Sequence, residues 1–283
     1  MNQIVDMENP RYTIQRELES GAQGTVVSAT DNHSNTTVAV KIIDITTTKG
    51  QRGFLTEVMA HEILKRGRAK SICQIQECIQ VPDKYGLIVM KQYESDLFDF
   101  TFNNNTPLTT EQVKNLFRGI CEAVKDMHLN GLAHLDIKPE NILLDSEGKP
   151  HLCDFGSSYF KKKRRRRFSM IERFPKNVAV EGIEGRGTKT YAAPEVFSGK
   201  AYNPYKADIY SLGMVLHVLL TGYFPEDTLE SSKSVVDPEC YKLLSHTINQ
   251  HPEKRLGINE VLHHKWLKKV KPKKRHVFSL RSL

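Results

Sequence analysis

The stretch HLDIKPENILL, residues 134–144, places a His, an Asp, a Lys, a Glu and an Asn within eight positions and then continues with aliphatic residues. A turn followed by a buried strand explains Pro139 and the leucines. It does not explain why Asp136, Lys138 and Asn141 occur together. Carboxylate, ammonium and amide groups can hold a proton, a phosphate or a metal ion. The stretch therefore indicates a site of chemistry at the edge of a buried strand.

The composition is that of a folded protein that can bury a large core. The 283 residues are enough for one domain or for two lobes that share a cleft. Hydrophobic residues make up 39% and charged residues 26%, which excludes a disordered or low-complexity chain. No apolar run reaches the roughly 18 residues of a membrane span, and the start MNQIVDMENP lacks the pattern of a leader. We expect an intracellular protein, cytoplasmic or nuclear or both, with no membrane partner.

Five cysteines are scattered and odd in number, so neither a disulfide framework nor a metal-binding pair is indicated. The net charge of +8 is concentrated in residues 161–167, which are seven consecutive cations, and in the C-terminal segment 265–276. The run 161–167 is either a solvated loop or a patch for an acidic partner or an import receptor. It lacks interleaved aromatic residues, so we do not expect nucleic acid as a partner.

The first part of the chain has the pattern of a small sheet with one helix. β-Branched or alternating runs, separated by turn residues, predict strands over residues 11–18, 24–30, 36–44 and 86–93. Residues 53–67 have apolar positions at helical spacing and end in a glycine, which predicts a helix before the last of these strands.

After Thr109 the pattern becomes helical. Residues 109–131 open with a threonine cap and predict a long amphipathic helix. Residues 207–222 are apolar almost all round but too few to span a bilayer, which predicts a helix buried in a large helical lobe. The layout is a small β-rich lobe, a short crossing near residues 90–96 and a larger α-rich lobe.

A glycine-containing turn precedes an unusual lysine in the small lobe. In ELESGAQGTVV, residues 17–27, Gly21 and Gly24 let backbone N–H groups approach a bound anion. In VAVK, Ala39 leaves room for a flat ring and Lys41 is a cation on an otherwise apolar strand. In isolation, a hairpin turn and a lysine at a strand edge would explain both.

With DFG at residues 154–156 and APE at residues 193–195, the stretch HLDIKPEN resembles the eukaryotic protein kinase family, from about Tyr12 to Trp266. The resemblance implies an α+β, two-lobed protein kinase fold. Its small β-rich N-lobe with one main helix covers about residues 12–90, and its larger α-helical C-lobe about residues 96–267. Residues 1–11 then form an N-terminal extension and residues 268–283 a basic tail.

The resemblance also implies roles for single residues. Asp136 accepts the proton of the substrate hydroxyl, Lys138 contacts the γ-phosphate, and both are catalytic. Asn141 and Asp154 hold Mg²⁺, which prefers hard oxygen ligands. The residues expected to bind ATP are Leu18, Gly21, Ala22, Gln23, Gly24, Val26, Ala39, Lys41, Glu57 and Met90.

Two carboxylates compete as the partner of Lys41. Glu57 fits the family pattern, because a leucine follows it after seven residues. Helix geometry favours Glu62, which falls on the apolar face near Leu55, whereas Glu57 lies nearly opposite Leu55. We expect Glu57 to be the partner.

Several positions depart from the family pattern. Glu19 stands where the first glycine of the loop is expected, and Gln23 replaces the usual aromatic residue at the loop tip. Leu135 replaces the arginine that precedes the catalytic aspartate and binds a phosphate on the activation segment. That segment, Asp154 to Glu195, has 42 residues, which looks long for the family, so we expect an insertion in it.

Thr188 together with Lys138 is the serine/threonine-kinase arrangement. Asp208 resembles the residue that anchors the catalytic loop, and Arg255 resembles the partner of Glu195. We therefore expect a monomeric kinase that transfers the γ-phosphoryl group of ATP to Ser or Thr hydroxyls of proteins, with Mg²⁺. The alternative is a pseudokinase scaffold that binds partners without phosphotransfer.

Overall fold

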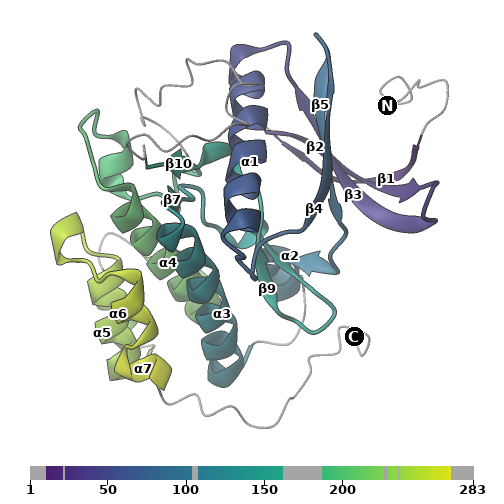
Figure 1. Cartoon of the computed structure of the whole chain (residues 1–283). Helices are drawn as coiled ribbons and strands as arrows, with labels where there is room; N and C mark the ends of the chain where they lie inside the picture. Colours follow the sequence, from purple (N-terminus) through teal and green to yellow (C-terminus); the bar gives the residue numbers. More distant parts are fainter. Residues whose placement is uncertain are drawn as a thin grey trace.

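A computed structural model of the chain describes residues 11–21, 23–103, 108–161, 187–225, 229–234 and 236–268. Ala22, most of the basic run 161–167 and the tail after Lys268 lie outside the described residues. Figure 1 shows a small sheet with one long helix against it, above a lobe of helices. None of the helices in the described part is long and apolar enough to cross a membrane.

The small lobe contains a five-stranded antiparallel sheet in the order β1-β2-β3-β5-β4. The strands are β1 (Tyr12–Gly21), β2 (Gly24–Asp31), β3 (Thr36–Asp44), β4 (Ile75–Val81) and β5 (Tyr85–Lys91). Four of them correspond to the predicted strands, and β4 was not predicted. Burial alternates along β4, but the polar Glu77 takes a half-buried position and Cys78 an exposed one, so the sequence lacks the hydropathy alternation by which a strand is recognised.

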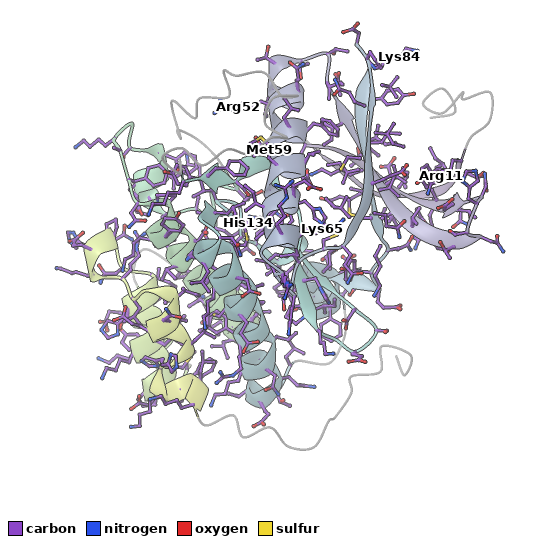
Figure 2. The ribbon with its side chains drawn as sticks, in the orientation of Figure 1. Arg11, Arg52, Met59, Lys65, Lys84 and His134 are labelled. Carbon is purple, nitrogen blue, oxygen red and sulfur yellow. The ribbon has the colours of Figure 1, made fainter. Side chains whose placement is uncertain are left out.

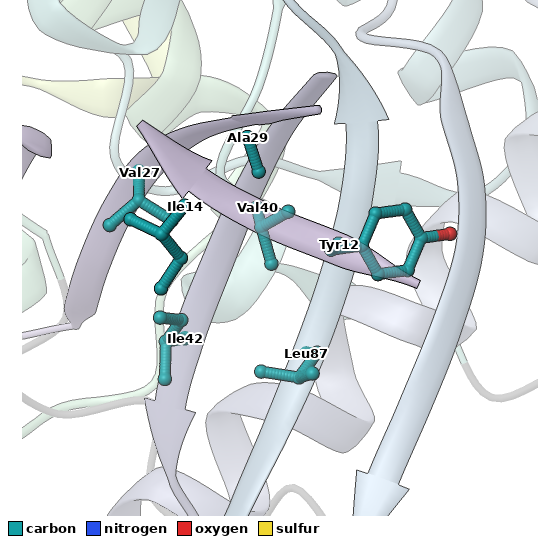
Figure 3. A pocket seen from close by; sticks show the side chains of 7 residues that line it. All are labelled: Tyr12, Ile14, Val27, Ala29, Val40, Ile42 and Leu87. Atoms are coloured by element: carbon teal, nitrogen blue, oxygen red, sulfur yellow. The ribbon is translucent and has the colours of Figure 1, made fainter. Parts of the chain in front are cut away.

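The sheet has two apolar faces, and β3 alternates between them. Val38, Val40 and Ile42 belong to a buried cluster with residues of β1, β2 and β5. A small apolar cavity lies in this cluster, lined by Tyr12, Ile14, Val27, Ala29, Val40, Ile42 and Leu87 (Figure 3). Ala39 and Ile43 belong to the other cluster, which includes residues of α1. Lys41 lies between them in sequence and faces the same side as Ala39, towards the second lobe.

Helix α1 (Thr48–Arg66) begins five residues before the predicted start. The hydroxyl of Thr47 accepts a hydrogen bond of 3.0 Å from the Gly50 N–H and so caps the first turn. Both Leu55 and Glu57 are buried, so the helix is covered on two sides. One side packs on the sheet, and the other faces the turn Phe155–Ser157 of the second lobe.

The large lobe is built around α3 (Thr110–Leu129) and α4 (Pro204–Thr221). The Thr109 hydroxyl caps α3 and Gln112 completes a capping box. Asn203 caps α4, which is buried along most of its length and ends at Gly222 in the left-handed conformation. The remaining helices are α2 (Leu97–Phe102), α5 (Pro238–Thr247), α6 (Ile258–Leu262) and α7 (Lys265–Lys268).

The stretch at residues 134–144 runs between short strands at the junction of the lobes. These strands are β6 (Ser95–Asp96), β7 (Leu132–Ala133), β8 (Ile142–Leu144), β9 (Pro150–Leu152) and β10 (Tyr159–Phe160). The polar half of the stretch forms the loop after β7 and a 3₁₀ turn at Pro139–Asn141, and its aliphatic end is β8. The loop therefore places its polar side chains where the two lobes meet.

Candidate active site

A buried lysine joins the two lobes through two carboxylates. Lys41 Nζ on β3 lies 2.8 Å from Glu57 Oε2 on α1 and 2.8 Å from Asp154 Oδ1 after β9. Although burial by itself opposes the charged forms, the pKa of Lys41 is raised by Glu57 and Asp154. Burial likewise disfavours the ionised Asp154, but the charge and hydrogen bond of Lys41 hold its pKa below the ordinary value. Each charge in this group thus depends on the others.

The geometry brings Glu57, and not Glu62, to Lys41. The Glu62 side chain is 48% exposed and lies 3.7 Å from Arg66 one turn along α1. The helical-periodicity argument for Glu62 was wrong because it assumes a single buried face, whereas α1 has two. Burial raises the pKa of Glu57, and the charge of Lys41 opposes this shift.

Asp136 is held by hydrogen bonds from three segments. Asn141 Nδ2 donates to the Asp136 carbonyl oxygen at 2.8 Å and to Oδ2 at 3.1 Å. The Thr188 N–H donates to Oδ1 at 2.7 Å, and Gln23 Nε2 lies 3.3 Å from Oδ2. The catalytic loop, the segment before APE and the glycine turn of the small lobe therefore meet at this one carboxylate.

Asp208 on α4 fixes the backbone of the loop from below. Its carboxylate accepts the N–H of His134 at 2.9 Å and of Leu135 at 2.8 Å, and it lies 2.9 Å from His128 Nε2. His134 is buried between the lobes, with Nε2 3.0 Å from the Cys153 carbonyl oxygen (Figure 2). A largely buried helix thus sets the position of Asp136 through the two residues that precede it.

Leu135 is buried in an apolar cluster and has a left-handed backbone. Its φ is 66° and its side chain is 4% exposed, packed with Ala133, Ala193, Val196 and Ala207. Non-glycine residues adopt this conformation only when their surroundings enforce it, and the bonds to Asp208 do so here. The position therefore contains packed hydrocarbon where the family pattern has a phosphate-binding arginine.

Gly187 crosses directly above this residue. Its φ is +84°, and a Cβ there would overlap the Leu135 carbonyl oxygen. Only glycine combines that conformation with such a close approach. Gly187 therefore sets how closely Thr188 approaches Asp136.

The two glycines of the β1–β2 turn differ in their surroundings. Gly21 has open space where a side chain would lie, whereas a Cβ on Gly24, at φ +127°, would overlap the Ile42 carbonyl oxygen. Gly24 thus keeps the turn close to β3. Although the Glu19 side chain is exposed, partial desolvation raises its pKa, and the positive charge of Lys138 counteracts this shift. The carboxylate of Glu19 therefore lies within the electrostatic reach of the site.

Between the lobes, Val26, Ala39 and Met90 belong to one apolar cluster, as expected for residues that enclose a flat ring. Leu143 and Cys153 of the large lobe pack against the same cluster and were not predicted as site residues. The period of two in β8 was an available signal, because Ile142 and Leu144 point into the core and Leu143 points away from it. Leu18 lies on β1 and is 38% exposed.

A buried ion pair lies beneath the APE segment. Arg255 NH1 and NH2 donate to the two carboxylate oxygens of Glu195 at 2.6 and 2.8 Å. Arg255 also donates to the carbonyl oxygens of Asn249 and Lys206. The pair ties the end of the activation segment to α4 and to the turn that follows α5.

A small antiparallel sheet over a helical lobe, with a lysine and several carboxylates at their junction, is typical of a two-lobed protein kinase. The protein kinase domain family matches residues 12–267, so the chain belongs to this family. The predicted α+β, two-lobed fold is confirmed.

Named relatives support the same assignment. CBL-interacting serine/threonine-protein kinase 12 of Arabidopsis thaliana is 30% identical over 92% of this chain and 53% of its own length. Serine/threonine-protein kinase SRK2E of Arabidopsis thaliana is 28% identical over 94% of this chain and 74% of its own length. Maternal embryonic leucine zipper kinase of Xenopus tropicalis is 28% identical over 90% and 39%. The chain thus spans about half or less of two of these relatives.

Proposed function

We propose that the protein is a serine/threonine protein kinase that transfers the γ-phosphoryl group of ATP to hydroxyl groups of protein substrates. The observation that carries the proposal is the network of Lys41, Glu57 and Asp154 across the lobes, next to Asp136 and Asn141. A network of buried and half-buried charges between two lobes is typical of a functional site, and its lysine and carboxylates suit a phosphate ligand with its cation.

The chain's own residues have distinct tasks in this reaction. Asp136, oriented by Asn141 and Thr188, accepts the proton of the substrate hydroxyl. Lys41 neutralises charge on the α and β phosphates, and Lys138 does so on the γ-phosphate. Val26, Ala39 and Met90, with Leu143 and Cys153, enclose the adenine ring. Gly21, Ala22 and Gly24 bring backbone N–H groups to the phosphates, and Leu18 covers the ring from β1.

The site also suits a magnesium ion. Asp154 supplies a carboxylate that stays ionised beside Lys41, and Asn141 supplies an amide oxygen because its nitrogen is engaged by Asp136. These are hard oxygen ligands of the kind that Mg²⁺ prefers. Bound Mg²⁺ supplies charge neutralisation on the phosphates.

The test is phosphate transfer from labelled ATP to a generic Ser/Thr protein. Asp136→Ala and Asp154→Ala should each abolish transfer, and only Asp154→Ala should strongly weaken Mg²⁺-dependent nucleotide binding. If the wild-type chain binds nucleotide but transfers no phosphate with any divalent metal, a scaffold function replaces catalysis.

The basic run 161–167 is proposed to bind an acidic partner or an import receptor. Apart from Lys161 it lies outside the described residues, so the proposal rests on its charge alone. Substituting all seven residues by alanine should move the protein from the nucleus to the cytoplasm. A distribution that does not change would contradict the import role.

A further inference from the structure

The side chain of Gln23 reaches from the small lobe to both carboxylates of the catalytic centre. Its Nε2 lies 3.3 Å from Asp136 Oδ2. The other end of the same amide lies 2.7 and 2.9 Å from Oδ1 and Oδ2 of Asp154. A single amide therefore lies between the proposed base and the proposed metal ligand, and its nitrogen can donate to only one of them at a time.

The surroundings of Gln23 keep this amide in place. Gly24 holds the turn against β3, as described above. On the other side, a Cβ on Gly156 would lie 3.2 Å from Gln23 Oε1 and 3.4 Å from Asp154 Oδ1. The absence of a side chain at Gly156 thus leaves room for the amide directly above the DFG backbone.

The contact with Asp154 has two chemical forms. With its nitrogen towards Asp154, the amide donates hydrogen bonds of 2.7 and 2.9 Å to the carboxylate. With its oxygen there, the two groups repel each other unless a cation lies between them. Oxygen ligands about 2.1 Å from an octahedral Mg²⁺ ion are neighbours at about 3 Å, close to the spacing seen here. A rotation of the Gln23 amide by a half-turn therefore presents its nitrogen to Asp154 in the cation-free site and its oxygen to the ion in the cation-bound site.

We propose that Gln23 is a protein ligand of the cation at Asp154, contributed by the small lobe. With a cation the amide oxygen faces the ion while the nitrogen donates to Asp136 Oδ2. Without a cation the nitrogen turns to Asp154, and its hydrogen bond to Asp136 is lost. The aromatic residue that the family pattern has at this position offers neither group. The inference rests on the proposed function, because it assumes that Asp154 holds the cation.

The experiment measures Mn²⁺ affinity by electron paramagnetic resonance, with the full chain and a non-hydrolysable ATP analogue. Gln23→Ala should weaken Mn²⁺ binding about tenfold, as loss of a metal-supporting contact does. Gln23→Glu keeps an oxygen ligand and adds a charge, so it should retain or strengthen Mn²⁺ binding but weaken nucleotide binding in EDTA. Thr25→Ala is the control, because the Thr25 hydroxyl faces Ser20 at 3.3 Å and not the carboxylates.

Equal Mn²⁺ affinity of wild type and Gln23→Ala would overturn the inference. So would a loss in Gln23→Ala that nucleotide binding in EDTA shares, because the turn as a whole would then be disturbed. Asp154→Ala separates this inference from the proposed function. If Asp154→Ala loses Mn²⁺ and Gln23→Ala does not, only the role of Gln23 fails. If Asp154→Ala retains Mn²⁺, the cation site itself is misplaced.

Discussion

Lys41 is a cation on an apolar strand, and it is stable there only because two carboxylates from different elements reach it. Its 5% exposure leaves no water to replace either of them. A buried charge that loses a partner is costly, so the three groups behave as one unit. The pairing of Lys41 with Glu57 of α1 can therefore be tested by substitution.

Glu57→Gln should lower kcat/KM for ATP at least tenfold, which corresponds to about 1.4 kcal/mol of barrier. The amide cannot balance the charge of Lys41, which would then be held by Asp154 alone. Glu62→Gln is the matched control on the same helix and should change kcat/KM less than twofold, because Glu62 is exposed and pairs with Arg66. Steady-state kinetics of both variants decide the assignment, and an effect of Glu62→Gln as large as that of Glu57→Gln would reverse it.

Leu135 gives a second prediction at the level of one side chain. Arginine at this position would order the activation segment through a phosphate, and leucine can make no such bond. We expect phosphatase-treated protein to keep most of its activity, since packing with Ala193 and Val196 holds the loop whatever the phosphorylation state. The initial rate before and after complete dephosphorylation is the measurement. A tenfold loss would show that another basic residue replaces the missing arginine.

At the level of whole elements, buried charged side chains of the large lobe connect its helices to its loops. Asp208 joins α4 to the catalytic loop, and Arg255 joins the APE segment to α4 and to the turn after α5. Both side chains are nearly or completely buried. If Arg255 is removed, the Glu195 carboxylate loses its ion pair. If Asp208 is removed, the N–H groups of His134 and Leu135 lose their acceptor.

Arg255→Ala should lower the free energy of unfolding by about 3–5 kcal/mol, because the Glu195 carboxylate would lose its paired charge in a buried place. Arg255→Met combined with Glu195→Gln removes both charges and should cost less than Arg255→Ala alone. Urea unfolding of the two variants gives the comparison. A combined variant that is less stable than Arg255→Ala would mean that the hydrogen bonds, and not the charges, stabilise this contact.

On the scale of the whole molecule, three partly or fully buried histidines make stability depend on pH. Burial lowers the pKa of His61, His217 and His264 below their ordinary value. The unfolded chain, with histidine pKa near 6.5, then binds more protons than the folded chain. Stability should therefore be fully present above about pH 6.5 and decrease as the pH falls, by at most about 1.4 kcal/mol per pH unit for each group.

His217→Gln tests this effect at the most buried of the three positions. His217 is completely buried, with Nδ1 3.0 Å from the Tyr223 carbonyl oxygen and Nε2 2.6 Å from Ser232 Oγ. Glutamine stays neutral, so the variant should lose less stability than the wild type between pH 7.5 and pH 5.5. Urea unfolding at the two pH values checks the result, and an unchanged difference would place the proton uptake elsewhere.

The architecture could be predicted from the sequence where a pattern belongs to one element. The burial of β3 and α4 follows from their local runs of apolar residues, and the polar loop at residues 134–144 is recognisable from its composition. The role of α1 could not be read in the same way, because periodicity does not reveal a second buried face. The bridge from Gln23 to Asp154 is also invisible in the sequence, since it joins positions 131 residues apart through backbone geometry at Gly24 and Gly156.

The anchoring by Asp208 has a consequence for amide hydrogen exchange. The N–H groups of His134 and Leu135 lie in a loop, where exchange is ordinarily fast, yet both donate to a fully buried carboxylate on α4. They can exchange only when the large lobe opens around that helix. The loop then belongs to the same cooperative unit as the lobe's core. Its two protected amides report on unfolding of the large lobe, and not on whether the nucleotide cleft is open or closed.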